Sequence, residues 1–373
     1  MRTFVFTCLL LLGMTTFAQD ANFHIYLCLG QSNMEGNAKV EEQDTVAVDS
    51  RFQVLAAVDC PNLGRIKGNW YKAVPPLARC YTGLTPGDYF GRAMVANLPS
   101  NVRVGIINVA VGGCRIELFD KDNYQSYVET SPDWLKNMVK EYGGNPFARL
   151  VEMAKLAQKD GVIKGILLHQ GESNTNDKDW PLKVKGVYDN LLNDLGLSAA
   201  NVPLLAGEVV HADQNGVCAS MNTIIDSLPQ VIPTAHVISS AGCPAAFDNL
   251  HFTAEGYRML GARYAAKMLS ILGYGDWTSA QNMKLWYNRP AQDWLEALPL
   301  GNSRLGAMVF GGTAREELQL NEETFWAGGP YNNNNPKGLQ VLPEIRRLIF
   351  EGKTLEAQKL IDENYMTPQH GMR

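Results

Sequence analysis

The chain has 373 residues, of which 46% are hydrophobic and 19% are charged, and its formal net charge at pH 7 is -5. A single hydrophobic core usually stops growing near ~250–300 residues, so the length predicts more than one domain. The weakly acidic balance and the lack of a Lys/Arg cluster argue against nucleic acid or an anionic membrane surface as a partner.

The first residues have the pattern of an export signal. Arg2 supplies a positive charge, Phe4–Met14 is a short apolar stretch, and Thr16-Phe17-Ala18 is a small-x-small cleavage site. The apolar stretch is too short to span a bilayer. We therefore predict a signal peptide over residues 1–18 and a secreted or periplasmic mature protein.

The remaining cysteines are compatible with an oxidising compartment. Cys60 with Cys80 and Cys218 with Cys243 are candidate local pairs, whereas Cys28 lies on an apolar run and is expected to be a small core residue. The sequence leaves the pairing open.

Apolar runs alternate with segments of helical period from residue 22 to residue 274. The runs are His24–Leu29, Val104–Val109, Val162–Leu168, Val202–Ala206 and His236–Ser239. The helical segments are Asp88–Leu98, Pro146–Lys159, Leu182–Leu195, Met221–Leu228 and Ala254–Leu272. This alternation predicts an α/β domain with a five-stranded parallel sheet covered on both faces. Residues 37–81 are weakly periodic and are predicted to be a long loop at the rim of a site.

The alternation ends after Gly273. Residues 283–287, 305–311 and 317–321 are predicted β segments, and residues 343–351 and 354–364 are predicted helices. The predicted organisation is thus a signal peptide (1–18), an α/β domain (19–273), a linker (274–282) and a β-rich segment (283–373).

Polar, glycine-rich motifs follow four of the predicted strands. They are Gly30-Gln31-Ser32-Asn33-Met34, Val111-Gly112-Gly113-Cys114-Arg115, His169-Gln170-Gly171-Glu172-Ser173 and Asp248-Asn249-Leu250-His251. In a parallel sheet the carboxyl ends of the strands share one edge, where ligands bind. The fold would therefore bring the four motifs together.

Their side chains are those needed for nucleophilic catalysis. A serine hydroxyl becomes a nucleophile when an imidazole accepts its proton, and a carboxylate on the other ring nitrogen fixes the tautomer. Ser32, His251 and Asp248 can fill these roles. The amide of Ser32, the amide of Gly112 or Gly113 and the side-chain amide of Gln170 are candidate oxyanion donors.

The four motifs in this order resemble the SGNH-hydrolase superfamily, and within it the acetylxylan-esterase and sialate-O-acetylesterase branch. The resemblance covers residues 22–272. It implies a flavodoxin-like three-layer α/β/α fold, a Ser32–His251–Asp248 triad, and removal of acetyl groups from sugar hydroxyls without a metal or other cofactor. Gln31 stands where the superfamily usually has Asp, and Gln170 where it usually has the oxyanion Asn.

Five further residues of these motifs, and Asn222 outside them, either contact the substrate or support the site. They are Gln31, Asn33, Arg115, His169, Glu172 and Asn222. Each has a structural alternative: Asn222 can cap a helix, Arg115 can pair with a carboxylate, and His169 can be buried without a catalytic role. Asp248 and His251 taken alone can also be a helix cap and a surface histidine.

Two other patterns in the sequence give weaker signals. Glu208 and His211 lack a third ligand, so no metal site is predicted. Trp70, Tyr71 and Tyr81 either stack on a sugar ring or fill space under the long loop.

The C-terminal segment resembles the amino-terminal β-sandwich of an α-L-fucosidase/α-L-galactosidase family. The resemblance lies in Lys284–Tyr287, Ala297–Val309 and Leu320–Pro330, with Ser303 where glycine is usual. The family's catalytic carboxylates belong to a barrel that this sequence does not contain. Glu322 and Glu323 are adjacent, so on a strand they point to opposite faces and do not form an acid/base pair. The segment is predicted to be an incomplete, catalytically silent piece.

The sequence therefore predicts an exported serine esterase that removes O-acetyl groups from an oligo- or polysaccharide, most simply one of the plant cell wall. A sialate O-acetylesterase is the alternative enzyme, and a carbohydrate-binding module without catalysis is the alternative of another class. The sequence makes no prediction about oligomeric state.

Overall fold

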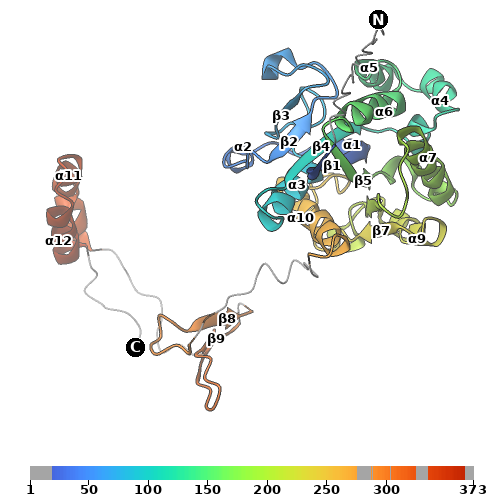
Figure 1. Ribbon diagram of the computed structural model, residues 1–373. Helices are drawn as coiled ribbons and strands as arrows, with labels where there is room; N and C mark the ends of the chain where they lie inside the picture. The colour runs from blue at the N-terminus through green and yellow to red at the C-terminus, as the bar shows by residue number, and fades with distance from the viewer. Residues whose placement is uncertain (1–18, 275–286, 288, 303, 325–334, 366–373) are drawn as a thin grey trace, which may run out of the picture. The chain divides into compact units, whose positions relative to one another are not determined.

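The computed structural model describes residues 19–274, 287, 289–302, 304–324 and 335–365. The chain divides into two compact units, residues 1–284 and residues 285–373 (Figure 1). The predicted signal peptide and nearly all of the predicted linker lie outside the described residues, so both stay predictions. No helix in the described part of the chain is long and apolar enough to cross a membrane.

The N-terminal unit is built on a seven-stranded sheet with the order β3-β2-β4-β1-β5-β6-β7. All neighbouring strands pair parallel except β3, which is antiparallel to β2. β1 lies at the centre because its side chains are apolar on both faces, as parallel sheets covered by helices require. The strands are β1 (Asp20–Gly30), β2 (Phe52–Leu55), β3 (Trp70–Lys72), β4 (Arg103–Ala110), β5 (Gly161–His169), β6 (Leu204–Gly207) and β7 (Ala235–Ile238).

The predicted α/β class is confirmed, and the predicted number of strands is corrected from five to seven. The five apolar runs became β1, β4, β5, β6 and β7, whereas β2 and β3 lie inside the predicted loop. These two strands span only 4 and 3 residues, and the side chains of β3 are half-buried or exposed. The sequence analysis did not recognise them because they lie within a segment that is weakly periodic as a whole.

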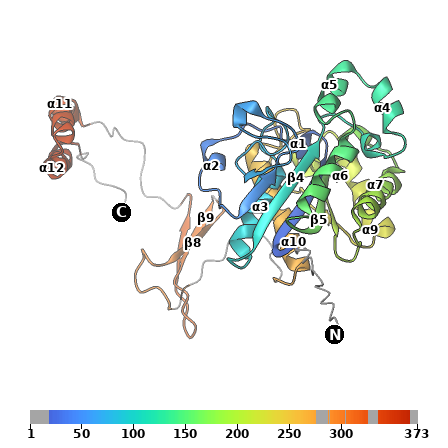
Figure 2. The same ribbon diagram turned by 45° about the horizontal axis from the view of Figure 1, so that its top comes forward.

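Helices cover both faces of the sheet, which confirms the predicted three-layer architecture (Figures 1 and 2). α3 (Pro86–Asn97) and α10 (Ala254–Ile271) pack on one face. α5 (Asp133–Glu141), α6 (Pro146–Ala157) and α7 (Trp180–Leu195) pack on the other. The shorter helices are α1 (Ser32–Glu35), α2 (Glu42–Thr45), α4 (Tyr124–Thr130), α8 (Asn222–Ile225) and α9 (Leu228–Val231).

Local signals in the sequence set where the main helices begin. Thr85 caps α3 and forms a capping box with Asp88, and Thr253 caps α10 by accepting a hydrogen bond from the Gly256 amide. Pro146 follows the cap residue Asn145 at the start of α6, where its missing N–H costs nothing. The predicted helix Met221–Leu228 is instead divided between α8 and α9.

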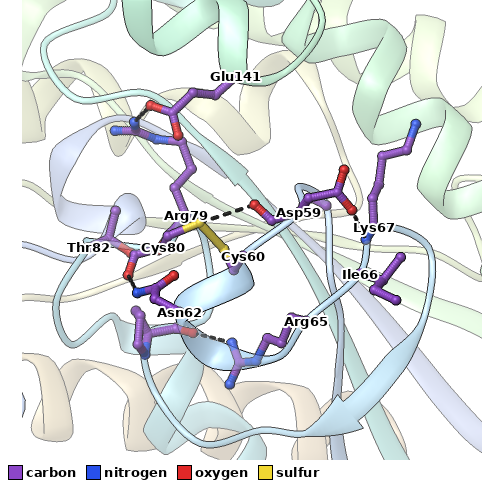
Figure 3. The surroundings of a disulfide bond; sticks show 12 residues. Asp59, Cys60, Asn62, Arg65, Ile66, Lys67, Arg79, Cys80, Thr82 and Glu141 are labelled. Atoms are coloured by element: carbon purple, nitrogen blue, oxygen red, sulfur yellow. Dashed lines mark hydrogen bonds and ion pairs between the residues drawn. A yellow bond between two sulfur atoms is a disulfide. The ribbon is translucent and has the colours of Figure 1, made fainter.

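The long segment between β1 and β4 is held by a disulfide between Cys60 and Cys80 (Figure 3). The other candidate pair is wrong, because Cys218 and Cys243 are both free. Cys218 packs against the core on the α7 face of the sheet and Cys243 belongs to the core on the α10 face, so the sheet separates them. Cys28 is a buried core residue, as predicted.

The C-terminal unit contains an antiparallel sheet with the order β10-β9-β8 and a helix pair. The predicted β segments at 305–311 and 317–321 correspond to β9 and β10, and the one at 283–287 lies outside the described residues except for Tyr287. The elements are β8 (Leu298–Gly301), β9 (Leu305–Val309), β10 (Leu318–Glu322), α11 (Pro336–Phe350) and α12 (Thr354–Asn364). α11 begins before the predicted residue 343 and contains Pro343 in its interior.

Candidate active site

Ser32 lies on a sharp turn between β1 and α1. Gly30 has φ +150°, and a Cβ there would lie 2.0 Å from the carbonyl oxygen of His169, so only glycine fits between the two strands. The Gln31 amide then donates to the same carbonyl at 3.0 Å. Ser32 is the first residue of α1, where a backbone amide has no acceptor within the helix. The turn therefore presents both the hydroxyl and the amide of Ser32.

The three residues predicted to form a triad are in contact. His251 Nε2 lies 2.9 Å from Ser32 Oγ, and His251 Nδ1 lies 2.7 Å from Asp248 Oδ2. The other carboxylate oxygen, Asp248 Oδ1, accepts the amides of Leu250 and His251, each at 3.0 Å. Burial by itself would raise the pKa of Asp248, but these hydrogen bonds outweigh it and hold the pKa below its usual value.

This geometry determines the tautomer of His251. An ionised carboxylate only accepts hydrogen bonds, so the proton on the imidazole must lie on Nδ1, facing Asp248. Nε2 then presents its lone pair to the hydroxyl of Ser32. The arrangement can accept the hydroxyl proton as the oxygen attacks a carbonyl carbon.

Asn33 connects the loop of His251 to the turn of Ser32. Its amide nitrogen donates to the Leu250 carbonyl at 3.0 Å, and its amide oxygen accepts the Phe252 amide at 3.4 Å and the Tyr257 hydroxyl at 2.6 Å. The side chain is fully buried. Asn33 therefore supports the site by fixing the backbone on both sides of His251, and it does not face a substrate.

Glu172 and His169 lie beneath this connection. Glu172 Oε1 accepts from the Asn33 amide at 2.5 Å and lies 3.6 Å from His169 Nε2, and the two side chains are only 3% and 0% exposed. Burial would raise the pKa of Glu172, but the contacts with His169 and Asn33 outweigh it and keep the pKa below its usual value. His169 is too deeply buried to act as a second base, and Glu172 acts on His251 through Asn33.

Gln170 does not supply an oxyanion donor, and this prediction is corrected. Its amide nitrogen lies within hydrogen-bond distance of Gln31 Oε1, the Cys114 carbonyl and Asn174 Oδ1, at 3.0, 3.3 and 2.8 Å. Its oxygen accepts from the Trp180 indole. Both hydrogens of the amide are thus used inside the protein, where they join the loops after β4 and β5. Gln31 shares this role, since its Oε1 also accepts the Gly171 and Ser173 amides.

The Gly112–Gly113 turn lies against Ser32. A Cβ built on Gly112 would lie 3.8 Å from the Cβ of Ser32 and 2.8 Å from Glu35 Oε2, so a larger residue would crowd the site. Gly113 has φ +70°, a conformation that favours glycine. The turn thus brings its backbone to the edge of the site, as predicted for a loop that approaches a substrate closely.

The sequence analysis missed an ion pair under this turn. Glu35 Oε1 accepts from Arg79 Nη2 at 2.5 Å and Arg79 Nε at 3.1 Å, and Arg79 also contacts Glu141 at the end of α5 (Figure 3). Burial raises the pKa of Glu35, and Arg79 and the Gly112 amide oppose this only in part. Arg79 precedes Cys80, so the disulfide holds the residue that neutralises Glu35. In the sequence, the one sign of this pair is Glu35, an acidic residue that directly follows the Ser32 motif and would need a cationic partner if buried.

Residues 22–270 match the family model described as carbohydrate esterase, sialic acid-specific acetylesterase. The chain belongs to this family. A protein of Arabidopsis thaliana named "Probable carbohydrate esterase" is 25% identical over 264 residues, which cover 66% of this chain and 90% of that protein. A solved structure of an Arabidopsis thaliana protein has the same fold, with a TM-score of 0.52 and 21% identity over 67% of this chain and 99% of that one. The family therefore confirms the prediction of a carbohydrate esterase.

Residues 285–371 match the family model for the N-terminal domain of glycosyl hydrolase family 65. Alpha-L-fucosidase 2 of Arabidopsis thaliana is 43% identical over 75 residues, which are 20% of this chain and 9% of that protein. The chain thus spans only a small part of that relative's length. The resemblance of the C-terminal segment is confirmed, and it concerns an N-terminal domain alone.

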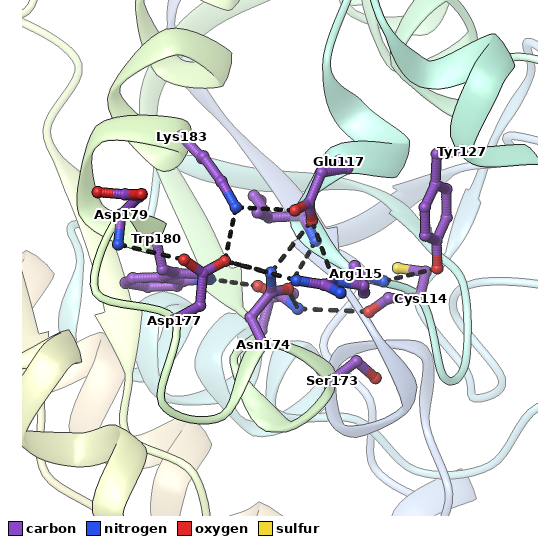
Figure 4. Close-up of polar contacts among 12 residues, drawn as sticks. Cys114, Arg115, Glu117, Tyr127, Ser173, Asn174, Asp177, Asp179, Trp180 and Lys183 are labelled. Carbon is purple, nitrogen blue, oxygen red and sulfur yellow. Dashed lines mark hydrogen bonds and ion pairs between the residues drawn. The ribbon is translucent and has the colours of Figure 1, made fainter.

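The Arg115 side chain is about half-exposed and lies in a network of charges (Figure 4). Arg115 lies 3.5 Å from Glu117 and 3.6 Å from Asp177, and Lys183 contacts the same two carboxylates at 2.9 and 2.6 Å. The buried side chain of Asn174 donates to both acids, at 3.1 Å to Glu117 and 3.0 Å to Asp177. The charges of Arg115 and Lys183 are therefore balanced by those of Glu117 and Asp177. The network joins the loops after β4 and β5 to α7.

Most of the remaining candidates have structural roles. Asn222 bonds to the amide and the carbonyl of Val209, so it holds the loop after β6 and does not face a substrate. Glu208 accepts from Ser239 and Ser240, and no three His, Cys, Asp or Glu side chains gather in a metal-binding group among the described residues. The indole of Trp70 packs on Phe23 with ring centroids 4.8 Å apart, and the Tyr71 hydroxyl accepts from the Ile66 amide. Tyr81 is 90% exposed.

Proposed function

We propose that the esterase removes O-acetyl groups from a glycan through an acyl-enzyme, with Ser32 as nucleophile, His251 as general base and acid, and Asp248 as the carboxylate that orients His251. The observation that carries this proposal is the continuous set of contacts from Ser32 Oγ to His251 Nε2 at 2.9 Å and from His251 Nδ1 to Asp248 Oδ2 at 2.7 Å.

The proposed reaction has two halves. Ser32 Oγ attacks the acetyl carbonyl carbon while His251 Nε2 accepts the hydroxyl proton, and His251 then protonates the sugar oxygen as its bond to the carbonyl carbon breaks. Water enters, gives its proton to His251 and attacks the acetyl-serine. Acetate leaves, and the proton on His251 returns to Ser32.

Backbone amides are the proposed oxyanion donors. The Ser32 amide opens α1, and the Gly112–Gly113 turn lies against Ser32, so the two segments can face the same carbonyl oxygen. Donors of this kind contribute about 3 kcal/mol each to stabilising the transition state. Fixed backbone dipoles suit this role because they need no rearrangement during the reaction.

The charges around the site support a neutral sugar as substrate. Arg115 and Lys183 are matched by Glu117 and Asp177, and Arg79 is matched by Glu35 and Glu141. A carboxylated sugar binds best where a cation is available to it, because bidentate pairs with Arg are strong. These matched cations favour an acetylated plant cell-wall polysaccharide, and the fucosidase-like C-terminal segment fits the same kind of substrate.

A sialate O-acetylesterase is the second candidate, because the matching family model is described as sialic acid-specific. We expect acetate release from acetylated xylan to exceed release from O-acetylated sialic acid at equal concentrations of acetyl groups. The opposite order of rates would select the second candidate.

Export is part of the proposal. The pattern of residues 1–18 and the Cys60–Cys80 disulfide both support an oxidising compartment outside the cytoplasm. Determination of the N-terminal residue of the mature protein tests it, with cleavage after Ala18 as the expected result.

The decisive experiment is Ser32→Ala. The variant should release no acetate from acetylated xylan and should not react with a fluorophosphonate probe, whereas Ser220→Ala, an exposed serine on the same unit, should behave as the wild type. Both variants should keep the thermal midpoint of the wild type. Unchanged acetate release by Ser32→Ala would refute the mechanism, and failure of the wild-type chain to react with the probe would favour a binding module.

A further inference from the structure

An exposed tryptophan lies beside the proposed oxyanion turn. Trp134 is in the first turn of α5 and 54% of it is exposed. Its indole lies over Gly113, because a Cβ on that glycine would lie 2.6 Å from Cη2 of the ring. The indole N–H makes no hydrogen bond with any described residue. The indole of Trp134 thus exposes a large apolar face to solvent, together with an N–H group that is free to donate to a ligand.

The helix that bears Trp134 is firmly held. Leu135 and Val139 of α5 are buried in the core, and the Tyr142 hydroxyl just after the helix donates to the Ala110 carbonyl at 3.2 Å. Glu141 contacts Arg79, which also holds Glu35. The indole therefore lies on a fixed support, and a ligand that binds to it pays little for ordering the protein.

The indole is close to the reacting atoms through a short series of contacts. Trp134 lies on Gly113, and a Cβ built on the neighbouring Gly112 would lie 3.8 Å from the Cβ of Ser32. A substrate whose acetyl carbonyl reaches Ser32 must place its sugar within a few bonds of that carbonyl. In an oligosaccharide, that sugar or its neighbour can reach the indole.

We propose that Trp134 is an aromatic platform on which a pyranose ring of the acetylated glycan stacks, with the indole N–H available to a sugar hydroxyl. This inference rests on the proposed function. One face of a pyranose carries mainly C–H groups, and tryptophan offers the largest flat apolar surface of any side chain together with a polar edge. A half-exposed indole beside an acyl-transfer site thus selects for a ring-bearing substrate over a simple ester.

A comparison of two substrates tests the proposal. For Trp134→Ala, the ratio of kcat/KM on an acetylated xylo-oligosaccharide to kcat/KM on triacetin should fall about tenfold, mainly through KM, as loss of a binding contact requires. Trp134→Phe should recover most of the ratio because it keeps a flat ring. Trp294→Ala in the C-terminal unit is the matched control, since Trp294 is 55% exposed, and it should leave the ratio unchanged.

Two kinetic results would overturn the proposal. An equal loss on both substrates would mean that Trp134 only supports the Gly112–Gly113 turn, and an unchanged ratio would mean that no sugar stacks there. An equal fall of the ratio in Trp294→Ala would also count against a platform at residue 134.

Binding separates this inference from the proposed function. Calorimetric titration of Ser32→Ala with the same oligosaccharide should show binding that weakens about tenfold in Ser32→Ala/Trp134→Ala. If the oligosaccharide binds in this way but the wild-type chain does not hydrolyse it, the proposed function fails and the platform stands. If binding does not depend on Trp134, the platform fails.

Discussion

Replacing Asp248 by asparagine is the sharpest test of the geometry at Ser32. The exchange keeps the shape of the side chain and removes its charge. Oδ1 accepts two backbone amides, from Leu250 and His251, so the amide oxygen of the variant should stay at that position. The NH2 group must then take the place of Oδ2, 2.7 Å from His251 Nδ1.

This orientation imposes the wrong tautomer on His251. The NH2 group only donates, so Nδ1 must present its lone pair and the proton must move to Nε2. Nε2 faces Ser32 Oγ and can no longer accept its proton. The same exchange in a serine protease lowers kcat by ~10⁴. Because the Asp248 side chain is 33% exposed and water can compete for it, we expect a loss of about 10³, or ~4 kcal/mol.

The measurement is kcat on 4-nitrophenyl acetate at pH 7, with the thermal midpoint as a check on folding. Asp213→Asn is a matched control, because Asp213 lies 3.2 Å from His211 Nδ1 in a second His–Asp pair of the same unit. The control should keep wild-type kcat. If folded Asp248→Asn retained more than about a tenth of wild-type kcat, the orienting role of the carboxylate would be refuted.

Two further predictions concern stability. Arg79→Met should lower the free energy of unfolding in urea by about 3 kcal/mol, because it leaves the buried charge of Glu35 without its partner. Lys185→Met breaks an exposed pair and should cost less than ~1 kcal/mol, and an equal loss in the two variants would contradict the argument. Burial raises the pKa of Asp88 to about 8. Since the unfolded carboxyl ionises near 3.8, the unfolded state binds fewer protons between these values and the contribution of Asp88 to stability falls as pH rises. The thermal midpoint of Asp88→Asn relative to wild type should therefore rise from pH 4 to pH 8, and a constant difference would contradict the assignment.

The sequence predicted the parts of the fold that have a strong periodic signal. Long buried strands such as β1 and β5 and long helices such as α7 and α10 are amphipathic or apolar over enough residues to be recognised. The short strands β2 and β3 are not, because they lie within a weakly periodic segment; β2 pairs with β4, and β3 pairs with β2. The predicted helix Met221–Leu228 is divided because Pro229, in the first turn of α9, has no amide hydrogen with which to continue the hydrogen bonds of α8.

At the site, the sequence located the side chains that the structure brings together but not the direction of each polar group. Ser32, Asp248 and His251 follow from spacing and strand ends, and the fold places them in contact. The structural role of the Gln170 amide could not be predicted, because its orientation depends on a hydrogen bond from Trp180 on the following helix. Trp134 and Arg79 were missed because each lies in a segment whose approach to the serine turn is set by tertiary packing.

The central position of β1 affects how the protein can be made. β1 pairs with β4 and β5, so the first strand to be synthesised has no partner until residues 103–110 and 161–169 follow. At a synthesis rate of ~5–20 residues per second, the apolar strand waits about 4–16 s for its first neighbour. Ser32, the proposed nucleophile next to β1, waits longer still for its contact with His251, which follows 219 residues later in the chain. We therefore expect an unpaired β1 to be the part of a newly made chain most exposed to self-association, and a chaperone that shields this strand to raise the yield of folded protein.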